Sequence, residues 1–324
     1  MGEKIDFVIT WVNGNDKKWQ KIKKEYTEKD KTNDNSAQRY RDYGSLKYLL
    51  RSIEKYSPWV NKVYLITDRQ VPKWLNIDYS KIKVIDHTEI IEKQYLPTFN
   101  SNAIEWNIDK IPELEEKFVY FNDDMLLNAE VRPEDFFETD LPKDFKIYNS
   151  IIPKQSFDHI LCSNLILINK RFKNSNKKRL FNVKYGWQQM RNFLLLPQLF
   201  RGIPGYLDPH GPLSLNKSSF KKVHQIWSKE INETIRHKFR KYNDISIWLV
   251  RYFQLETGKF KPRSASFNKY YEMDEIEKIK KDLKKKISNT MCINDTKIEN
   301  FNEVSDRLVD ILEQKFKNKS KFER

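Results

Sequence analysis

The sequence predicts an α/β fold: a mostly parallel, Rossmann-like sheet flanked by helices, with a helical C-terminal part that completes the site. Short apolar runs recur through the first 125 residues, a helical pattern separates the first two runs, and the alternation loosens after about residue 130. Strand, helix and strand in this order form a parallel sheet in most folds. We therefore assign a Rossmann-like half to residues 1–130 and a basic half with C-terminal helices to residues 131–324, integrated as one domain.

Four runs in the first half are predicted as strands from their β-branched and aromatic content. They cover residues 5–10, 63–67, 82–85 and 117–121. Residues 17–38 are polar and rich in Lys, Asn and Asp, which predicts a surface excursion or lid.

One helix is predicted between the first two strands. Asp42 is placed to cap its start, and Pro58 lies just past its end. The apolar residues at helical spacing are Leu46, Leu49, Leu50, Ile53 and Tyr56.

The second half predicts one strand, one loop and three helices. The strand covers residues 164–169, and a basic, exposed loop follows over residues 170–184. Helices are predicted over residues 240–257, 274–287 and 303–316, because apolar residues recur there every three or four positions.

The net charge of +15 is unevenly distributed. Residues 1–150 carry 24 basic and 27 acidic residues, whereas residues 151–324 carry 36 basic and 18 acidic residues. The second half should therefore attract an anionic partner, and nucleic acid, a phosphorylated substrate and an anionic membrane all fit.

Composition excludes several classes of protein. Hydrophobic residues make up 39% of the chain, with only 8 Gly and 12 Pro, which excludes disordered, collagen-like and low-complexity chains. No apolar run approaches the length of a membrane span, and the first residues lack the pattern of a signal peptide. Cys162 and Cys292 cannot form a disulfide framework or a four-cysteine zinc site. These features predict a cytoplasmic protein.

The first candidate site is the polar segment directly after the first strand. Ligands of open α/β sheets bind outside the carboxyl ends of strands. Asn13 and Gly14 can grip a nucleotide there, with Trp11 packed on a base or on the core. Asn-Gly is foremost a turn signal, so the local sequence by itself favours a plain turn.

The second candidate site is the segment Asn122, Asp123 and Asp124, directly after the fourth strand. Two adjacent carboxylates repel each other unless a cation relieves them, and a hard divalent ion prefers oxygen ligands and often bridges a phosphate. Nucleotide-sugar transferases have their acidic metal motif at this position. A solvated loop with a helix cap explains the local sequence equally well.

The third candidate site lies in the basic half. His210 sits between two prolines, in a turn that would fix its imidazole, and a histidine can act as a general base near neutral pH. Arg240 and Asp244 lie four apart on a predicted helix, and an arginine can clamp phosphate oxygens. In isolation, a turn histidine and a surface Arg–Asp pair are more often structural.

These segments resemble motifs of the Stealth family of sugar-1-phosphate transferases. The family contains bacterial capsule and cell-wall polysaccharide phosphotransferases and the catalytic subunits of the enzyme that tags lysosomal glycoproteins with N-acetylglucosamine-1-phosphate. The resemblance runs nearly end to end in four blocks. They are residues 5–16; motifs at 39–42, 46–48, 50–59, 70–76, 96–101, 103–105 and 120–124; His210, Gly211, Pro212, Phe220, Arg240 and Asp244; and residues 292–295 with 320–323.

The chain departs from the family pattern at two places. It has Gly44 and Ser45 where the family usually has acidic residues, which should weaken a contact made by that acid. It has Asp68 and Arg69 where the family usually has Asn-Gly, which suggests a different choice of donor or acceptor.

The resemblance implies a GT-A-like sheet and a specific reaction. A UDP-N-acetylhexosamine or UDP-hexose would bind in the first half, and an acceptor hydroxyl bound by the second half would attack its β-phosphorus. UMP would leave and a phosphodiester would join two sugars in a capsular or cell-wall polysaccharide.

The resemblance also assigns roles to individual residues. His210 would be the base, with Asp244 as the competing candidate, while Arg240 and Arg41 would hold the transferred phosphoryl group. The implied nucleotide-sugar site contains Thr10, Trp11, Asn13, Gly14, Asp42, Asn100, Ser101 and Asn122. The implied ligands of Mg²⁺ or Mn²⁺ are Asp123, Asp124, Asn294 and Asp295.

Two other functions compete with this one. A GT-A glycosyltransferase would use the same donor but release UDP, and a non-enzymatic polyanion-binding module would bind nucleic acid without turnover. Against the module, no nucleic-acid motif is present, so we expect no nucleic-acid partner. The acceptor can be lipid-linked at the inner membrane face, with the Lys-rich stripe at 274–287 on anionic lipid, although a solvated helix face explains that stripe better.

Overall fold

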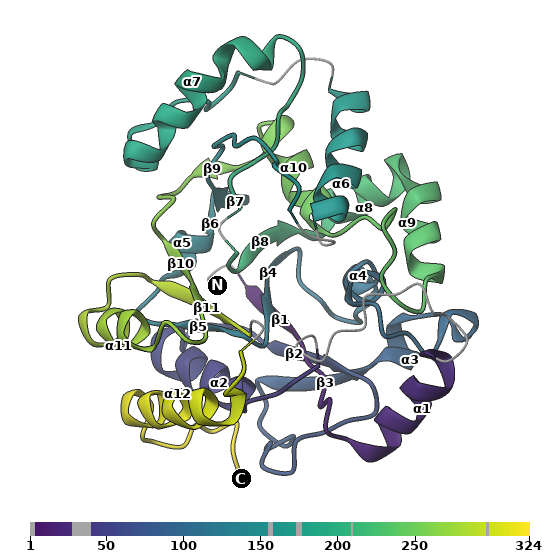
Figure 1. Ribbon diagram of the computed structural model, residues 1–324, viewed down its shortest axis with the longest axis vertical. Helices are drawn as coiled ribbons and strands as arrows, with labels where there is room; N and C mark the ends of the chain where they lie inside the picture. The colour runs from purple at the N-terminus through teal and green to yellow at the C-terminus, as the bar shows by residue number, and fades with distance from the viewer. Residues whose placement is uncertain (1–3, 28–39, 155–157, 173–176, 209, 296–297) are drawn as a thin grey trace.

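The computed structural model describes residues 4–27, 40–154, 158–172, 177–208, 210–295 and 298–324 (Figure 1). Its centre is a sheet of five strands in the order β3-β2-β1-β4-β8. The strands β1 (Ile5–Thr10), β2 (Val63–Thr67), β3 (Ile82–Asp86) and β4 (Lys117–Asn122) are all parallel. β8 (Leu213–Asn216) pairs antiparallel with β4 at one edge. The predicted α/β fold with a mostly parallel sheet is confirmed.

Helices cover both faces of this sheet because alternate residues of each strand point to opposite sides. Phe7 and Phe121 pack with α2 (Ser45–Tyr56), α11 (Ile276–Lys285) and α12 (Phe301–Lys315), whereas Val8 and Phe118 pack with helices of the other face. Those helices are α6 (Asp158–Arg171), α8 (Lys217–Ile226), α9 (Ser228–Arg236) and α10 (Trp248–Glu256).

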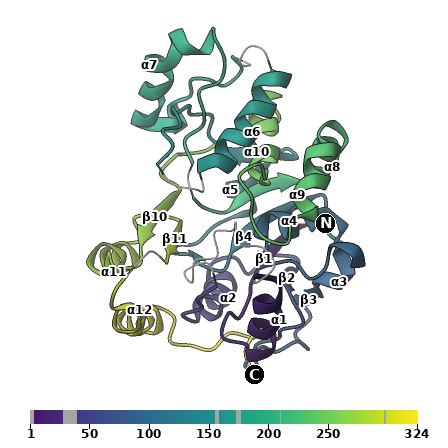
Figure 2. The ribbon, with the colours of Figure 1, turned by 45° about the vertical axis from the view of Figure 1, so that its right-hand side comes forward.

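The remaining elements are short or lie at the periphery (Figure 2). The helices are α1 (Lys17–Thr27), α3 (His87–Ile90), α4 (Ser101–Glu105), α5 (Pro133–Phe136), α7 (Met190–Leu199) and the 3-10 turns η2 (Lys93–Tyr95), η3 (Ile108–Lys110) and η4 (Val183–Gln189). The strands are β5 (Met125–Leu127), β6 (Phe137–Glu138), β7 (Leu141–Asp144), β9 (Lys261–Pro262), β10 (Asn268–Glu272) and β11 (Thr290–Asn294).

Segments of both predicted halves share sheets. β8 joins the central sheet through β4, and β11 pairs with both β10 and β5 in a second sheet. The division at residue 130 stays a prediction, but these pairings bring β11 next to the end of β4.

The C-terminal tail is locked onto α2 by a buried arginine. The Arg51 guanidinium donates to both carboxylate oxygens of Glu323, to Glu313 and to the carbonyl oxygen of Phe316. A buried charge needs this number of partners, because an unpaired one is costly to desolvate. The tail therefore fixes the position of α12 against α2.

The first-half strands are confirmed, but the predicted cap is wrong. The residue before α2 is Gly44, in the left-handed conformation, and no side chain caps the helix. The Asp42 carboxylate instead accepts the Gly44 backbone N–H at 2.6 Å and the Trp11 indole N–H at 2.9 Å. Of the predicted excursion over 17–38, residues 17–27 form α1 and residues 28–39 lie outside the described residues.

The predicted strand over 164–169 is wrong, because these residues belong to α6. A short apolar run does not distinguish a buried strand from a buried helix segment. Leu167 and Ile168 face the core while Ile166 is exposed, and the buried Asn164 donates to Ser246 at 2.9 Å. Of the predicted basic loop over 170–184, residues 170–171 belong to α6, residues 173–176 lie outside the described residues and residues 183–184 belong to η4. Between them, Lys177 and Lys178 are exposed, although Leu180 is buried.

The predicted helix over 240–257 is too long at its start, because α10 begins at Trp248. Lys241 and Asp244 form a turn in which the Asp244 carboxylate accepts the Lys241 backbone N–H at 3.0 Å. Such a local side-chain bond competes with the helix, so Arg240 and Asp244 do not share a helix face. The other two helices are confirmed, except that the exposed Ile287 lies beyond α11.

Within the described parts of the chain, no helix has both the length and the apolar character that crossing a bilayer requires.

Candidate active site

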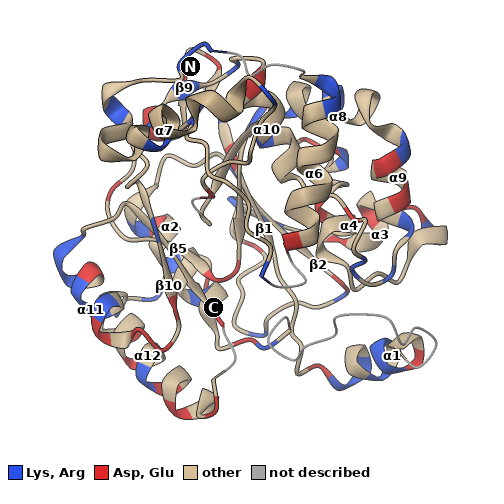
Figure 3. Ribbon diagram, turned by 45° about the horizontal axis from the view of Figure 1, so that its top comes forward, with Lys and Arg blue, Asp and Glu red and all other residues tan. Residues whose placement is uncertain are grey.

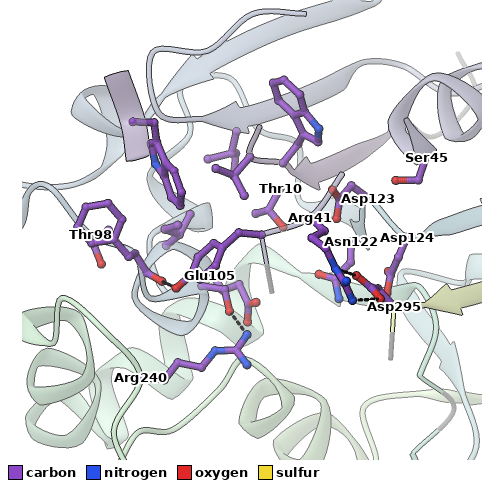
Figure 4. A pocket seen from close by; sticks show the side chains of 18 of the residues that line it. Thr10, Arg41, Ser45, Thr98, Glu105, Asn122, Asp123, Asp124, Arg240 and Asp295 are labelled. Atoms are coloured by element: carbon purple, nitrogen blue, oxygen red, sulfur yellow. Dashed lines mark hydrogen bonds and ion pairs between the residues drawn. The ribbon is translucent and has the colours of Figure 1, made fainter. Parts of the chain in front are cut away.

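An open cavity of about 220 Å³ lies at the carboxyl ends of β1 and β4. This edge of an open α/β sheet is where ligands bind. Figure 4 shows two ends: Glu105 and Arg240 lie at one, Asp123 and Asp295 at the other, and Thr10 lies between them.

The acidic end is formed by the two carboxylates that follow β4. They keep some surface open to the cavity, but the surrounding protein desolvates them. Burial, together with the charges of Asp124 and Asp42, raises the pKa of Asp123 well above its ordinary value. Burial also raises the pKa of Asp124, and the charge of His210 and a hydrogen bond from Cys292 oppose this shift.

One oxygen of Asp124 lacks a partner. Its Oδ2 accepts a hydrogen bond from Cys292 Sγ at 3.3 Å, whereas its buried Oδ1 has no hydrogen-bond partner among the described residues. A buried polar atom without a partner is rare and points to a missing ion or water. The donor set around it contains carboxylate and amide oxygens, the ligands that Mg²⁺ and Mn²⁺ prefer.

The described residues contain no cluster of three or more His, Cys, Asp or Glu side chains able to hold a metal by themselves. Mg²⁺ commonly uses one or two carboxylates and takes its other ligands from substrate phosphates and water. Asp123 and Asp124, with the neighbouring Asn122 amide, therefore fit an ion shared with a phosphorylated substrate.

Arg41 and Asp295 close the acidic end. The Arg41 Nε and Nη2 atoms each lie 2.7 Å from an oxygen of Asp295, and the guanidinium packs over the Phe301 ring at 4.0 Å. The neighbouring Asn294 donates to the Tyr270 hydroxyl at 3.0 Å. The bidentate pair neutralises Asp295 and ties the segment after β11 to the segment before α2.

The basic end is formed by Arg240 and the first turn of α4. The Arg240 guanidinium donates to Ser101 Oγ at 2.5 Å and lies close to the Glu105 carboxylate. Glu105 is only 8% exposed, and burial raises its pKa to about 7, although the charge of Arg240 opposes the shift.

The hydroxyl of Tyr120 connects the two ends of the cavity. It lies 3.2 Å from Glu105 Oε1, 2.8 Å from Thr10 Oγ1 and 2.7 Å from Asn122 Oδ1. Tyr120 is buried on β4, so this chain of contacts is fixed to the central sheet.

Asp244 holds the turn that carries Arg240. Its fully buried carboxylate lies 2.6 Å from His237 Nδ1 and accepts from Asn100 Nδ2 at 2.7 Å, in addition to the Lys241 N–H. Asn100 also caps α4 by accepting the Asn102 backbone N–H at 3.1 Å. Asp244 and Asn100 thus position Arg240 and Ser101 without lining the cavity themselves.

His210 lies beside the acidic end but does not line the cavity. Its backbone N–H donates to Asp208 Oδ1 at 2.6 Å, its Nδ1 lies 3.5 Å from Asp208 Oδ2, and its ring meets the Tyr270 ring edge-on at 5.0 Å. Burial by itself would lower the pKa of His210, but the hydrogen bond and charge of Asp208 and the charge of Asp124 raise it above the ordinary value.

In the loop after β1, Thr10 and Trp11 line the cavity. Asn13 is held behind them, because its backbone N–H donates to Gln70 Oε1 at 2.7 Å. A Cβ on Gly14 would lie 1.8 Å from the Tyr40 carbonyl oxygen, so only glycine allows this approach.

Three matches to conserved regions of the Stealth proteins cover most of the cavity residues: conserved region 1 over residues 3–31, region 2 over 39–145 and region 3 over 209–253. The chain is 43% identical to an exopolysaccharide phosphotransferase (cps2G) of Lactiplantibacillus plantarum, covering 99% of this chain and 96% of the relative. It is 42% identical to a capsular polysaccharide phosphotransferase (WcwK) of Streptococcus pneumoniae, covering 99% and 98%.

The chain belongs to the Stealth family. The predicted family and the predicted enzyme class, a phosphotransferase, are thereby confirmed. Among solved structures, the galactosyltransferase LgtC matches with 9% identity and a TM-score of 0.42 over 95% of each chain. A TM-score below 0.5 does not establish a shared fold, so the assignment depends on the sequence matches.

Of the residues that the sequence assigns to the site of this Stealth protein, the structure brings ten to the cavity wall. They are Thr10, Trp11, Arg41, Ser101, Asn122, Asp123, Asp124, Arg240, Asn294 and Asp295. The six others, Asn13, Gly14, Asp42, Asn100, His210 and Asp244, lie behind or beside the wall.

The sequence analysis missed two sets of wall residues. Glu105 lines the cavity and lies within the family motif at residues 103–105, but no role was predicted for it. An aromatic wall of Trp19, Tyr40 and Phe99 is backed by Phe239, whose ring stacks on Phe99 with centroids 5.1 Å apart. Apolar residues spread this widely in a sequence give no signal that they meet.

We expect Glu105→Gln to stabilise the free protein at neutral pH. The pKa of Glu105 rises from 4.5 to about 7 on folding, so the folded state binds the extra proton and stability falls as pH rises between these values. Above pH 7 the variant should gain up to about 3 kcal/mol over wild type, and below pH 4.5 the gain should vanish. Denaturant unfolding across this range measures the difference.

The exposed Glu303→Gln on α12 is the matched control, with no such pH-dependent gain. A gain for Glu105→Gln that is the same at all pH values would contradict the assigned pKa.

Proposed function

We propose that this Stealth enzyme transfers a sugar-1-phosphate from a UDP-sugar to a hydroxyl group of an acceptor saccharide. UMP leaves, and the new phosphodiester becomes part of a capsular polysaccharide or exopolysaccharide, the products in the names of the relatives. The observation that carries the proposal is the two-ended cavity, with under-neutralised carboxylates at one end and Arg240 at the other. Phosphoryl transfer needs this combination of charge neutralisation and positioning.

Asp123 and Asp124 would hold Mg²⁺ or Mn²⁺, with the Asn122 amide beside them. The bound ion would neutralise charge on the diphosphate of the donor. Asp295, neutralised by Arg41, would keep the end of β11 in place beside these ligands.

Arg240 would bind oxygens of the transferred phosphoryl group and stabilise the charge that develops there. Ser101 and Glu105 hold the guanidinium from the far side, and the Asp244 turn fixes its backbone. The uridine would lie against Trp11 and the aromatic wall, since bases stack well on aromatic rings.

His210 would accept the proton of the acceptor hydroxyl, whose oxygen attacks the β-phosphorus while the bond to the UMP oxygen breaks. Its Nδ1 faces Asp208, which leaves Nε2 for the acceptor. The side chain is 39% exposed, so an acceptor can reach it. The Asp244 carboxylate is buried under three donors, which favours His210 as the base.

A GT-A glycosyltransferase that releases UDP is the remaining alternative. The names of the relatives, which are phosphotransferases, favour phosphoryl transfer, whereas an arginine on the β-phosphoryl oxygens would serve either reaction. Membership of an enzyme family removes the non-enzymatic polyanion-binding module. We place the reaction in the cytoplasm, with a saccharide acceptor that can be lipid-linked.

Product analysis tests the proposal. The protein is incubated with Mg²⁺, a panel of UDP-hexoses and UDP-N-acetylhexosamines and an oligosaccharide acceptor, and UMP is separated from UDP by chromatography. We expect UMP in proportion to the product, and Arg240→Lys should lower kcat by about 10²–10³-fold. The control Arg236→Lys, exposed at the end of α9, should match wild type. UDP as the product would mean glycosyl transfer.

His210→Asn and Asp244→Asn separate the two candidate bases. We expect His210→Asn to lower kcat by about 10²–10⁴-fold, because the proton acceptor is lost. Its melting temperature should fall less than that of Asp244→Asn, because the His210 side chain is 39% exposed. Asp244→Asn should lower the melting temperature, because an amide cannot serve three buried donors as a carboxylate does. Steady-state kinetics and thermal unfolding measure both. Wild-type kcat in His210→Asn would exclude it as the base.

A further inference from the structure

One face of η4 and α7 exposes large apolar side chains to solvent. Val183 is 89% exposed, Trp187 86%, Phe193 60% and Leu194 72%. We call this surface the η4–α7 face; its residues are Val183, Trp187, Met190, Phe193, Leu194, Pro197 and Phe200, all exposed. Within α7 they recur at helical spacing, so they form one continuous stripe. Apolar patches of this kind mark interaction sites.

Basic residues surround the η4–α7 face. Residues 145–207 contain 11 Lys and Arg residues and one acidic residue, Asp158. Lys184 and Arg191 lie on η4 and α7 themselves, and Arg201 follows directly. Figure 3 shows Lys and Arg around α7. Lys146 is buried and paired with Glu256, and the charge of Lys184 acts on Glu138, but the other basic residues of this segment greatly outnumber its acidic residues. A stripe of apolar side chains on a predominantly basic segment is complementary to an anionic, apolar partner.

The opposite side of α7 is packed against the protein through the side chain of Asn192. The buried Asn192 accepts the Tyr148 backbone N–H at 2.7 Å and donates to the carbonyl oxygens of Lys146 and Leu180. Tyr148 in turn donates to Glu256 of α10 at 2.7 Å, and Glu256 pairs with the buried Lys146. The helix is thus fixed to the protein by its polar side and offers its apolar side to solvent.

We propose that the η4–α7 face docks on the surface of an anionic phospholipid membrane. Interfacial helices insert apolar and aromatic side chains at the headgroup boundary while Lys and Arg bind anionic lipid. Trp187 suits this boundary because indole rings favour membrane interfaces. A soluble protein partner would need a matching acidic surface with an apolar centre, whereas an anionic bilayer offers both properties without a specific partner.

This assignment differs from the Lys-rich stripe of α11, which the sequence suggested for the same role. The apolar residues of α11, Ile276, Ile279 and Leu283, are all buried in the core. The helix therefore offers charge without side chains that can insert. Figures 1 and 2 place α7 at one end of the molecule and α12, next to α11, toward the other.

Membrane docking through the η4–α7 face does not require the proposed phosphoryl transfer, but it would affect where a lipid-linked acceptor meets the enzyme. Phe200 and His210 are ten positions apart in the sequence. If the proposed function holds, docking through α7 would bring a lipid-linked acceptor to the half of the enzyme that carries its base.

Vesicle flotation with the full-length protein tests this proposal. The probes are vesicles of phosphatidylcholine with an equal part of phosphatidylglycerol, and vesicles of phosphatidylcholine alone. We expect binding to the anionic vesicles, and Trp187→Ser with Phe193→Ser should weaken the partition at least about tenfold. Val71→Ser with Ile77→Ser, two exposed apolar residues near β2 and β3, is the matched control and should bind as wild type.

Charge variants provide a second test that does not require a change in the apolar stripe. Lys184→Glu with Arg201→Glu should weaken anionic-vesicle binding, while Lys281→Glu with Lys284→Glu on α11 should leave it unchanged. UMP release with a soluble acceptor should be unchanged in every one of these variants, so a failure of docking is distinguishable from a failure of the proposed reaction.

The proposal would be overturned if the wild-type protein did not bind anionic vesicles, or if the Trp187→Ser, Phe193→Ser variant bound them as well as wild type does. Loss of binding in the Lys281→Glu, Lys284→Glu variant, with binding retained in the Lys184→Glu, Arg201→Glu variant, would also overturn it. Sedimentation velocity completes the test. A wild-type dimer that becomes monomeric in the Trp187→Ser, Phe193→Ser variant, without vesicle binding, would show that the η4–α7 face meets a second copy of the chain.

Discussion

The rest of the site is arranged around two adjacent carboxylates at the end of β4. Asp123 and Asp124 are desolvated, repel each other and, among the described residues, form no ion pair that would neutralise them. Keeping such a pair ionised is unfavourable in the free protein, and a proton or a bound cation removes the penalty. The same feature that costs stability therefore suits the proposed role of this edge of the sheet, which is to bind a divalent ion together with a diphosphate.

The fold supplies the two ends of the cavity from different parts of the chain. The β11 strand pairs with β5 directly after the acidic motif, and Arg41 secures its end through Asp295. The basic end depends on Asp244, which joins the turn of Arg240 to the cap of α4. Tyr120 then links both ends to one strand. Each end has its own support, because Asp295 holds Arg41 at the acidic end and Asp244 holds the Arg240 turn at the basic end.

The sequence was sufficient to predict what depends on local pattern and on the family motifs: the four parallel strands and the acidic pair after β4. It was not sufficient where long-range packing decides. The apolar run within 164–169 fits a strand as well as the helix it forms, and the spacing of Arg240 and Asp244 fits a helix that the Asp244 carboxylate replaces with a turn. The position of Glu105 and of the aromatic wall follows only from the folding of α1 and α4 around the same cavity as the end of β1.

The central claim is that Asp123 and Asp124 hold the ion that binds the donor diphosphate, opposite Arg240. The most direct measurement is a crystal structure with Mn²⁺ and a non-transferable phosphonate analogue of the UDP-sugar, with the ion located by its anomalous scattering. We expect an anomalous peak in contact with both carboxylates and the diphosphate, and Arg240 on the β-phosphoryl oxygens. A diphosphate bound away from these carboxylates, or an ion held by other residues, would contradict it.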